Sequence, residues 1–232
     1  MGIVTTSIGI EMLLRWGHFL AGVTWIGLLY YFNFVQMEYF KEAEAGAKSD
    51  AIQKLVPRAL WWFRWGAVLT LLTGLGIFGI RGGGMSMDIY VGALIAIFMF
   101  TNVWLIIWPN QKILIASTEE VAKGGEAFPE AAGAAATAGL ASRTNTLFSI
   151  PMLFFMGASA HYPHGFSALA FIAAVLVILV LEYNGAYPMI KHLGALQKLP
   201  AGGKMKFYAS VNGVIHCGLG LTVVLFLILD YL

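Results

Sequence analysis

The sequence has few charged residues: Asp, Glu, Lys and Arg make up only 11% of its 232 residues, while 59% are hydrophobic. Soluble domains carry roughly 25% charged residues, so this composition excludes a single water-soluble core. The apolar runs are continuous rather than alternating, which indicates membrane helices and not a barrel. We therefore expect one integral membrane domain over residues 1–232, an all-α polytopic membrane helix bundle.

Cysteine is almost absent, because Cys217 is the one cysteine of the chain. This excludes an intrachain disulfide and a cysteine-based metal cluster. The motif C-x-x-C-H is missing, so a covalently attached c-type haem is excluded as well. The net charge of +2 is too small to indicate a nucleic-acid partner. The N-terminus lacks a basic region, and we expect its first apolar run to be retained as an anchor.

Six stretches are long and apolar enough to span a membrane, since a spanning helix needs about 20 apolar residues. These predicted spans cover residues 12–36, 60–80, 89–109, 144–162, 166–187 and 207–229. The polar segment 110–143 would connect the third and fourth spans, and its part 123–139 would be either a flexible loop or a short interfacial helix.

Lysine and arginine are distributed unevenly among the connections. Arg15 and Arg81 lie toward one side. The other lysines and arginines fall in or beside the first, third and fifth connections. The fifth connection carries Lys191, Lys198 and Lys204, and also His192. By the positive-inside rule these three connections are cytoplasmic and both termini are outside. We expect a multi-pass protein of the bacterial inner (plasma) membrane, with membrane lipids as its surroundings.

Histidines inside membrane helices are candidate functional residues, because ionisable groups are costly there. His18 lies in the first predicted span, His161 closes the fourth, and His216 lies in the sixth. Two imidazoles on facing helices could hold a b-type haem through its iron. His18 and His161 form the first expected ligand pair, and His216 is the alternative or a ligand of a second haem. Structural histidines that only bond a neighbour are the open alternative.

The residues around His18 suit a haem pocket. Trp25 and other aromatic or small residues of the first span could line a porphyrin. Arg15 lies one turn before His18 on the same helical face, where it could bind a haem propionate. It could equally extend its charged end to the lipid headgroups.

A second polar group is expected near the cytoplasmic side, where several helix ends meet. The sequence allows either helix capping with headgroup contacts, which is favoured, or a polar pocket for a small anion or a quinone headgroup. Its members are Asn33, Gln36, Arg64, Asn110, Gln111, Arg143 and Asn145.

Copper is a weaker possibility than haem. Met152, Met156 and His161 follow one another along the fourth span, and thioether and imidazole groups suit copper. Methionine in membrane helices more often serves packing.

Three stretches resemble the urate oxidase N-terminal domain family, the membrane domain of bacterial cytochrome-type urate oxidases. They are RWGHFLAGVTWIGLLYYFNFVQ, WWFRWGAVLTLLTG and ASRTNTLFSIPMLFFMGASAHYP, within residues 10–165. The first helix is also similar to that of HemJ-type protoporphyrinogen oxidases, through His18, Trp25 and Gly27. The stretch from SRTN to HYP is the most specific part.

The resemblance implies a haem-linked membrane oxidoreductase domain that passes electrons to a fused cytochrome c. It transfers roles to His18, Trp62 with Arg64, and the fourth-span residues Arg143, Asn145 and His161. The chain ends at Leu232 without a cytochrome c domain, so a separate partner is expected. The fifth helix ends LEYNGAYP, where the family is expected to carry a histidine.

We therefore expect a protein that binds haem b and transfers electrons to or from a cytochrome c or other membrane oxidoreductase subunits. The alternatives are a membrane urate hydroxylase that uses a separate cytochrome c, and a non-redox accessory or copper-handling subunit. Enzymatic activity is left open.

Overall fold

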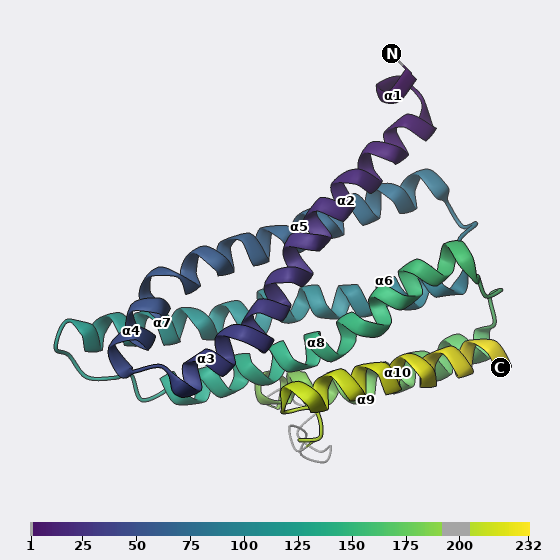
Figure 1. Ribbon diagram of the computed structural model, residues 1–232. Helices are drawn as coiled ribbons and strands as arrows, with labels where there is room; N and C mark the ends of the chain where they lie inside the picture. The colour runs from purple at the N-terminus through teal and green to yellow at the C-terminus, as the bar shows by residue number, and fades with distance from the viewer. Residues whose placement is uncertain (1, 192–204) are drawn as a thin grey trace.

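The computed structural model describes residues 2–191 and 205–232, and every regular element in these two ranges is a helix. The predicted all-α membrane bundle is thereby confirmed (Figure 1). His192, Lys198 and Lys204 lie outside the described residues. In chain order the elements are α1 (Gly2–Thr5), α2 (Ser7–Tyr30), the π-helix η1 (Tyr31–Gln36), α3 (Met37–Glu42), α4 (Ala45–Lys54), α5 (Val56–Arg81), α6 (Met87–Thr101), the π-helix η2 (Asn102–Ile107), α7 (Trp108–Ala122), α8 (Ala131–His161), α9 (Ala168–Ile190) and α10 (Val211–Tyr231).

Five helical stretches are long and apolar enough to cross a membrane. They are Ser7–Glu42, Val56–Arg81, Met87–Ala122, Ala168–Ile190 and Val211–Tyr231, and they overlap five of the six expected spans. The remaining expected span, 144–162, corresponds to the second half of α8, which is not among the five. The expected long connection 110–143 is wrong, because α7 continues to Ala122 and α8 begins at Ala131.

Side-chain caps and glycine mark several helix ends. Thr6, Ser167 and Ser210 each accept a hydrogen bond from a backbone N–H in the first turn of α2, α9 and α10, which satisfies donors that a helix leaves unpaired. Gly82 ends α5 with a φ of 62°, a left-handed conformation that glycine adopts without steric cost.

Helix α8 lies at the centre of the bundle and packs against α2, α6, α7, η2, α9 and α10. It contains a buried polar run, residues 143–146, together with buried apolar side chains such as Phe148 and Phe155. Because neighbouring helices cover α8, its polar side chains face protein groups and not lipid. This position explains why α8 can be less apolar than its neighbours α2, α6, α9 and α10.

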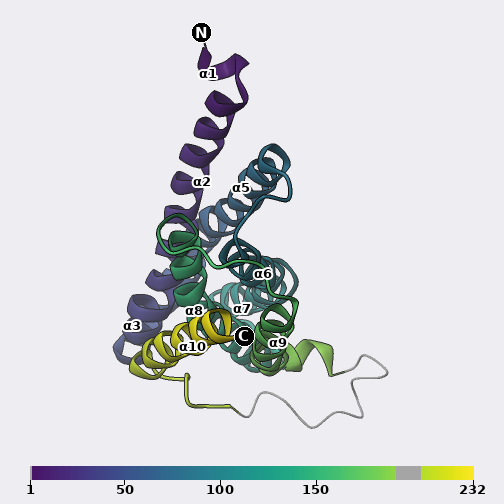
Figure 2. The same ribbon diagram turned by 90° about the vertical axis from the view of Figure 1, so that its right-hand side faces the viewer.

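The two ends of the bundle are named by residues that lie there. We call the end that carries residues 43–55 and 123–130, together with Lys191 and Lys206, the basic end. The opposite end, where α5 leads into α6 and α8 leads into α9, is called the His164 end. Viewed along the bundle (Figure 2), α9 and α10 lie side by side, whereas the N-terminal half of α2 leans away from them.

Candidate functional site

The three candidate haem histidines lie in separate places. His18 faces α5, where its Nδ1 is 2.9 Å from the Thr73 hydroxyl. His161 is exposed at the last residue of α8, and His216 is exposed in the second turn of α10, at the basic end. Since α10 has 21 residues and is about 30 Å long, His216 and His161 lie near opposite ends of the bundle. No contact among the described residues joins any two of these histidines.

Arg15 and Trp25 contact residues of α2 and α5. The Nε atoms of Arg15 and Arg81 both lie 2.8 Å from Oε1 of Glu11, so Arg15 joins an ion-pair cluster that ties α2 to α5. Trp25 is buried in the core, and its backbone N–H lies against Gly66 of α5.

His164 holds the His164 end together. Its Nδ1 lies 2.8 Å from one carboxylate oxygen of Asp88, and its backbone N–H donates to the other oxygen, also at 2.8 Å. Nε2 lies 3.6 Å from Asp230 at the end of α10. Asp88 is fully buried. One imidazole thus connects α6, the α8–α9 turn and α10.

Four consecutive residues of α8 connect it to its neighbours near the basic end. Ser142 accepts a hydrogen bond from the amide of Asn33 in η1, and Thr144 accepts one from the hydroxyl of Tyr208, 3.2 Å away. Tyr208 is the donor there because the Thr144 hydroxyl donates to its own helix. Burial raises the pKa of Tyr208 above its ordinary value, so the phenol keeps its proton.

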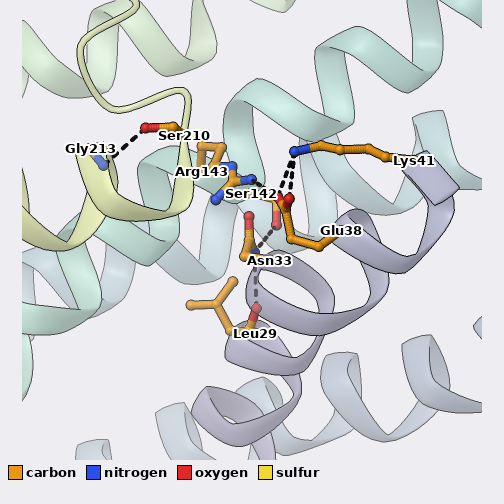
Figure 3. A network of polar contacts seen from close by, with 8 residues as sticks. All are labelled: Leu29, Asn33, Glu38, Lys41, Ser142, Arg143, Ser210 and Gly213. Carbon is orange, nitrogen blue, oxygen red and sulfur yellow. Dashed lines mark hydrogen bonds and ion pairs between the residues drawn. The ribbon is translucent and has the colours of Figure 1, made fainter.

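Arg143, the second of these four residues, is a buried cation with few partners. Its exposed fraction is 4%, and neither Nε nor Nη1 has a hydrogen-bond partner among the described residues. Nη2 lies 3.8 Å from Glu38 of α3. Glu38 is already held by Lys41 at 2.7 Å, as Figure 3 shows. The guanidinium therefore has unused donors in a place from which water is largely excluded.

A cavity of about 640 Å³ lies beside Arg143, within the roughly 300–1,000 Å³ that is usual for small-molecule sites. Among the described residues, its charged lining residues, Arg143, Lys191 and Lys206, are all basic. The described lining is Met37, Ala135, Ala136, Thr137, Gly139, Leu140, Arg143, Tyr187, Pro188, Lys191, Met205, Lys206, Tyr208 and Ala209. The cavity can therefore hold a small anion between α3, α8 and the end of α9.

The predicted polar group of the cytoplasmic side is divided among several places. Asn33 packs beneath Ser142 next to Arg143 (Figure 3). Arg64 lies on the face of Trp108, 3.4 Å from its ring centre. The amide of Asn110 donates within its own helix and contacts Met189. Of the seven residues of the predicted polar group, Arg143 lines this cavity.

Asn145 belongs to a polar cluster in the interior of the bundle. Its carbonyl oxygen and Oε2 of Glu182 both accept from the amide of Asn102, each at 3.0 Å. Sequence reasoning missed Asn102 and Glu182. A signal was present, because Glu182 is an acidic residue within the long apolar run of α9, and such residues are functional candidates.

Two π-helices interrupt the long helices next to these polar groups. η1 contains Asn33 and Gln36, and η2 begins at Asn102. A π-turn adds a residue to the helical turn and is frequent at functional sites. Both segments contain buried amide side chains, those of Asn33, Gln36 and Asn102.

The family model for the urate oxidase N-terminal domain matches residues 83–212. The chain belongs to this urate oxidase N-terminal family. The match begins after α5, so it differs from the expected extent, 10–165, and leaves out His18 and Arg64. It covers Arg143 and, apart from Met37, the whole cavity lining of this family member. No curated protein and no solved structure matches the chain significantly.

Proposed function

We propose that this protein is a membrane oxidoreductase domain that binds urate, or a closely similar planar anion, in the cavity beside Arg143. One observation carries the proposal: Arg143 lines a basic cavity, its guanidinium is buried, and two of its nitrogens have no partner among the described residues. The family name supplies the substrate class. We place the protein in the bacterial plasma membrane.

Arg143 suits such a ligand for a physical reason. A buried cation without a counter-charge is costly, and a bound anion would offset that cost. The planar fork of the guanidinium can give two parallel hydrogen bonds to neighbouring acceptors, which urate offers in its ring nitrogens and carbonyl oxygens. Lys191 and Lys206 would add long-range attraction, and Tyr208 borders the same cavity.

The proposed reaction is a two-electron oxidation. Urate and one water molecule yield a hydroxylated product, two protons and two electrons. In this chain Arg143 would bind and orient the anion, and the electrons would leave to a separate redox partner. A cytochrome c, or another membrane oxidoreductase subunit, remains the partner expected from the family resemblance.

A steady-state assay tests this function. Purified protein in nanodiscs is given urate and an artificial electron acceptor, and kcat/KM is measured. We expect Arg143→Gln to lower kcat/KM at least 100-fold, because the substitution removes the charge and the fork. Arg64→Gln is the matched control, since Arg64 is stacked on Trp108 away from the cavity, and it should retain activity within about threefold. Equal activities of the two variants would refute the assignment.

Haem b binding is a second candidate function, and one observation favours it. The Thr73 hydroxyl donates to Leu69 in its own helix, so it accepts from Nδ1–H of His18, which leaves a lone pair on Nε2 for a metal. The fit is partial, because neither His161 nor His216 faces His18 in this chain. His18 would hold the haem through Nε2, and the haem would supply one-electron chemistry.

A reduced-minus-oxidised absorption spectrum of the purified protein tests the haem proposal. A b-type alpha band that disappears in His18→Ala and persists in His161→Ala would support His18 as a ligand. Protein made with ample haem that shows no such band would contradict it. The copper-handling alternative has less support, since Met152 and Met156 pack into the interface with α6. No cluster of three or more His, Cys, Asp or Glu side chains suited to a metal occurs in residues 2–191 and 205–232.

A further inference from the structure

A second hollow lies on the other side of the η1–α3 segment from the Arg143 cavity. It has a volume of about 420 Å³ and lies between η1–α3 and α4. Its lining consists of Tyr31, Val35, Gln36, Tyr39, Ala47, Asp50, Ala51 and Leu55. We call it the Gln36 groove. Its size is again within the usual range for small-molecule sites.

Gln36 is the unusual residue of this groove. Its exposed fraction is 9%, and its Oε1 is buried without a hydrogen-bond partner among the described residues. A buried amide left unpaired costs free energy, so such groups are normally satisfied by protein, water or a ligand. The amide offers both a donor and an acceptor, which suits a ligand that is a carbonyl in one state and a hydroxyl in another.

The electrostatics of the groove differ from those of the Arg143 cavity. The charged residue of its lining is Asp50, an acid that pairs with Lys54. A small anion would therefore be disfavoured. Val35 and Leu55 at the rim are 57% and 49% exposed, and two tyrosine rings border the hollow. These features suit a neutral, flat and largely apolar molecule that enters from the bilayer.

We propose that the Gln36 groove binds the headgroup of a membrane quinone. The ring would lie near Tyr31 and Tyr39, a ring oxygen would bond to the Gln36 amide, and the isoprenoid tail would pass Val35 and Leu55 into the lipid. The quinone and its quinol can both be bound, because the amide can donate to a carbonyl and accept from a hydroxyl.

The groove lies close to the Arg143 cavity, so the bound quinone would accept the electrons released there. This role rests on the proposed urate oxidation. Residues of one helical segment line both hollows: Gln36 and Tyr39 line the groove, whereas Met37 lines the Arg143 cavity. One helix, about 10 Å across, separates them. Two electrons and two protons released from urate and water would convert one quinone to one quinol, so the reaction is balanced.

Direct binding of a short-chain ubiquinone analogue tests the site. The full-length protein is reconstituted in nanodiscs, and the dissociation constant is measured by equilibrium dialysis against empty nanodiscs. We expect Gln36→Leu, which is similar in shape, to weaken binding at least tenfold. Gln53→Leu is the matched control, because Gln53 also lies beside this region but its amide bonds to Ser49; it should leave binding unchanged.

A second variant covers the case in which Gln36→Leu misfolds. Ala51→Trp, on the α4 wall, should fill the groove and abolish binding, and the surface position of α4 lets the fold persist. Arg143→Gln should bind the analogue normally, so a failure of the urate proposal remains distinguishable. Wild-type binding no stronger than partition into empty nanodiscs, or binding as strong as the wild type's in both Gln36→Leu and Ala51→Trp, would overturn the quinone site.

Discussion

Arg143 and Arg64 carry the same side chain in two different environments. The guanidinium of Arg64 is stabilised by aromatic rings, whereas that of Arg143 has nitrogens without a partner among the described residues. Arg64 lies on the faces of Trp108 and Trp104, where cation–π attraction offsets its loss of water. Arg143 is more deeply buried, and its nearest carboxylate, Glu38, is shared with Lys41. This difference is why we assign ligand binding to Arg143.

A stability measurement follows from that contrast. Arg143→Met should raise the free energy of unfolding of the ligand-free protein by about 1–3 kcal/mol, because replacing a poorly compensated buried charge by an apolar group of similar length is often stabilising. In this variant Glu38 is still paired with Lys41, so the substitution does not leave its carboxylate unpaired. Chemical unfolding in detergent, followed by circular dichroism, measures the change.

Arg64→Met is the comparison for that experiment. It removes the stack on Trp108 and should lower stability by about 0.5–2 kcal/mol. If Arg143→Met were the more destabilising of the two, Arg143 would be a structural residue and its unpaired nitrogens would have no bearing on a ligand.

At the scale of the elements, α8 and α9 approach closely beside the site. A Cβ on Gly185 would meet Cβ and Cγ2 of Thr144 at 2.8 Å, so this glycine sets the spacing that lets Thr144 reach Tyr208. Gly185→Ala should lower the free energy of unfolding by about 1–3 kcal/mol through overpacking.

Gly157→Ala provides the control in the same helix pair, because nothing lies within 4 Å of the added Cβ. It should raise stability by roughly 0.5–1 kcal/mol through helix propensity. Thermal unfolding of both variants gives the comparison. A Gly185→Ala variant as stable as wild type would show that α8 and α9 can separate without cost.

The three elements joined at the His164 end give a further prediction. His164→Ala leaves the fully buried Asp88 without its side-chain partner, and losing one member of a buried pair typically costs about 3–5 kcal/mol. His161→Ala, three residues earlier and exposed, should change stability by less than about 0.5 kcal/mol. Unfolding midpoints that shift equally in the two variants would contradict this role for His164.

At the scale of the whole molecule, composition and apolar run length were sufficient to predict a helical membrane bundle and the approximate positions of its most apolar helices. They could not predict that α8 would be the covered central helix, because burial of a polar helix depends on its neighbours and not on its own residues. The lengths of α7 and α8 were underestimated for a related reason: alanine-rich and polar residues continue a helix beyond the apolar part.

The candidate site was only partly predictable. Arg143 was among the predicted polar residues, since a cation beside a membrane span attracts attention. Arg64 instead packs on Trp108, Asn110 bonds within its own helix, and Asn145 faces Asn102. Spacing in the sequence does not reveal these partners. The histidine pair was inferred from depth alone, and depth does not determine which helices face one another.

The central claim is that Arg143 binds a urate-type anion in the cavity at the basic end. Isothermal titration calorimetry of urate into the purified protein, with Arg143→Gln and Arg64→Gln alongside, tests it most directly. We expect saturable one-to-one binding by the wild type and by Arg64→Gln, and affinity at least tenfold weaker in a folded Arg143→Gln variant. Urate binding of equal strength in all three proteins, or in none of them, would contradict the account.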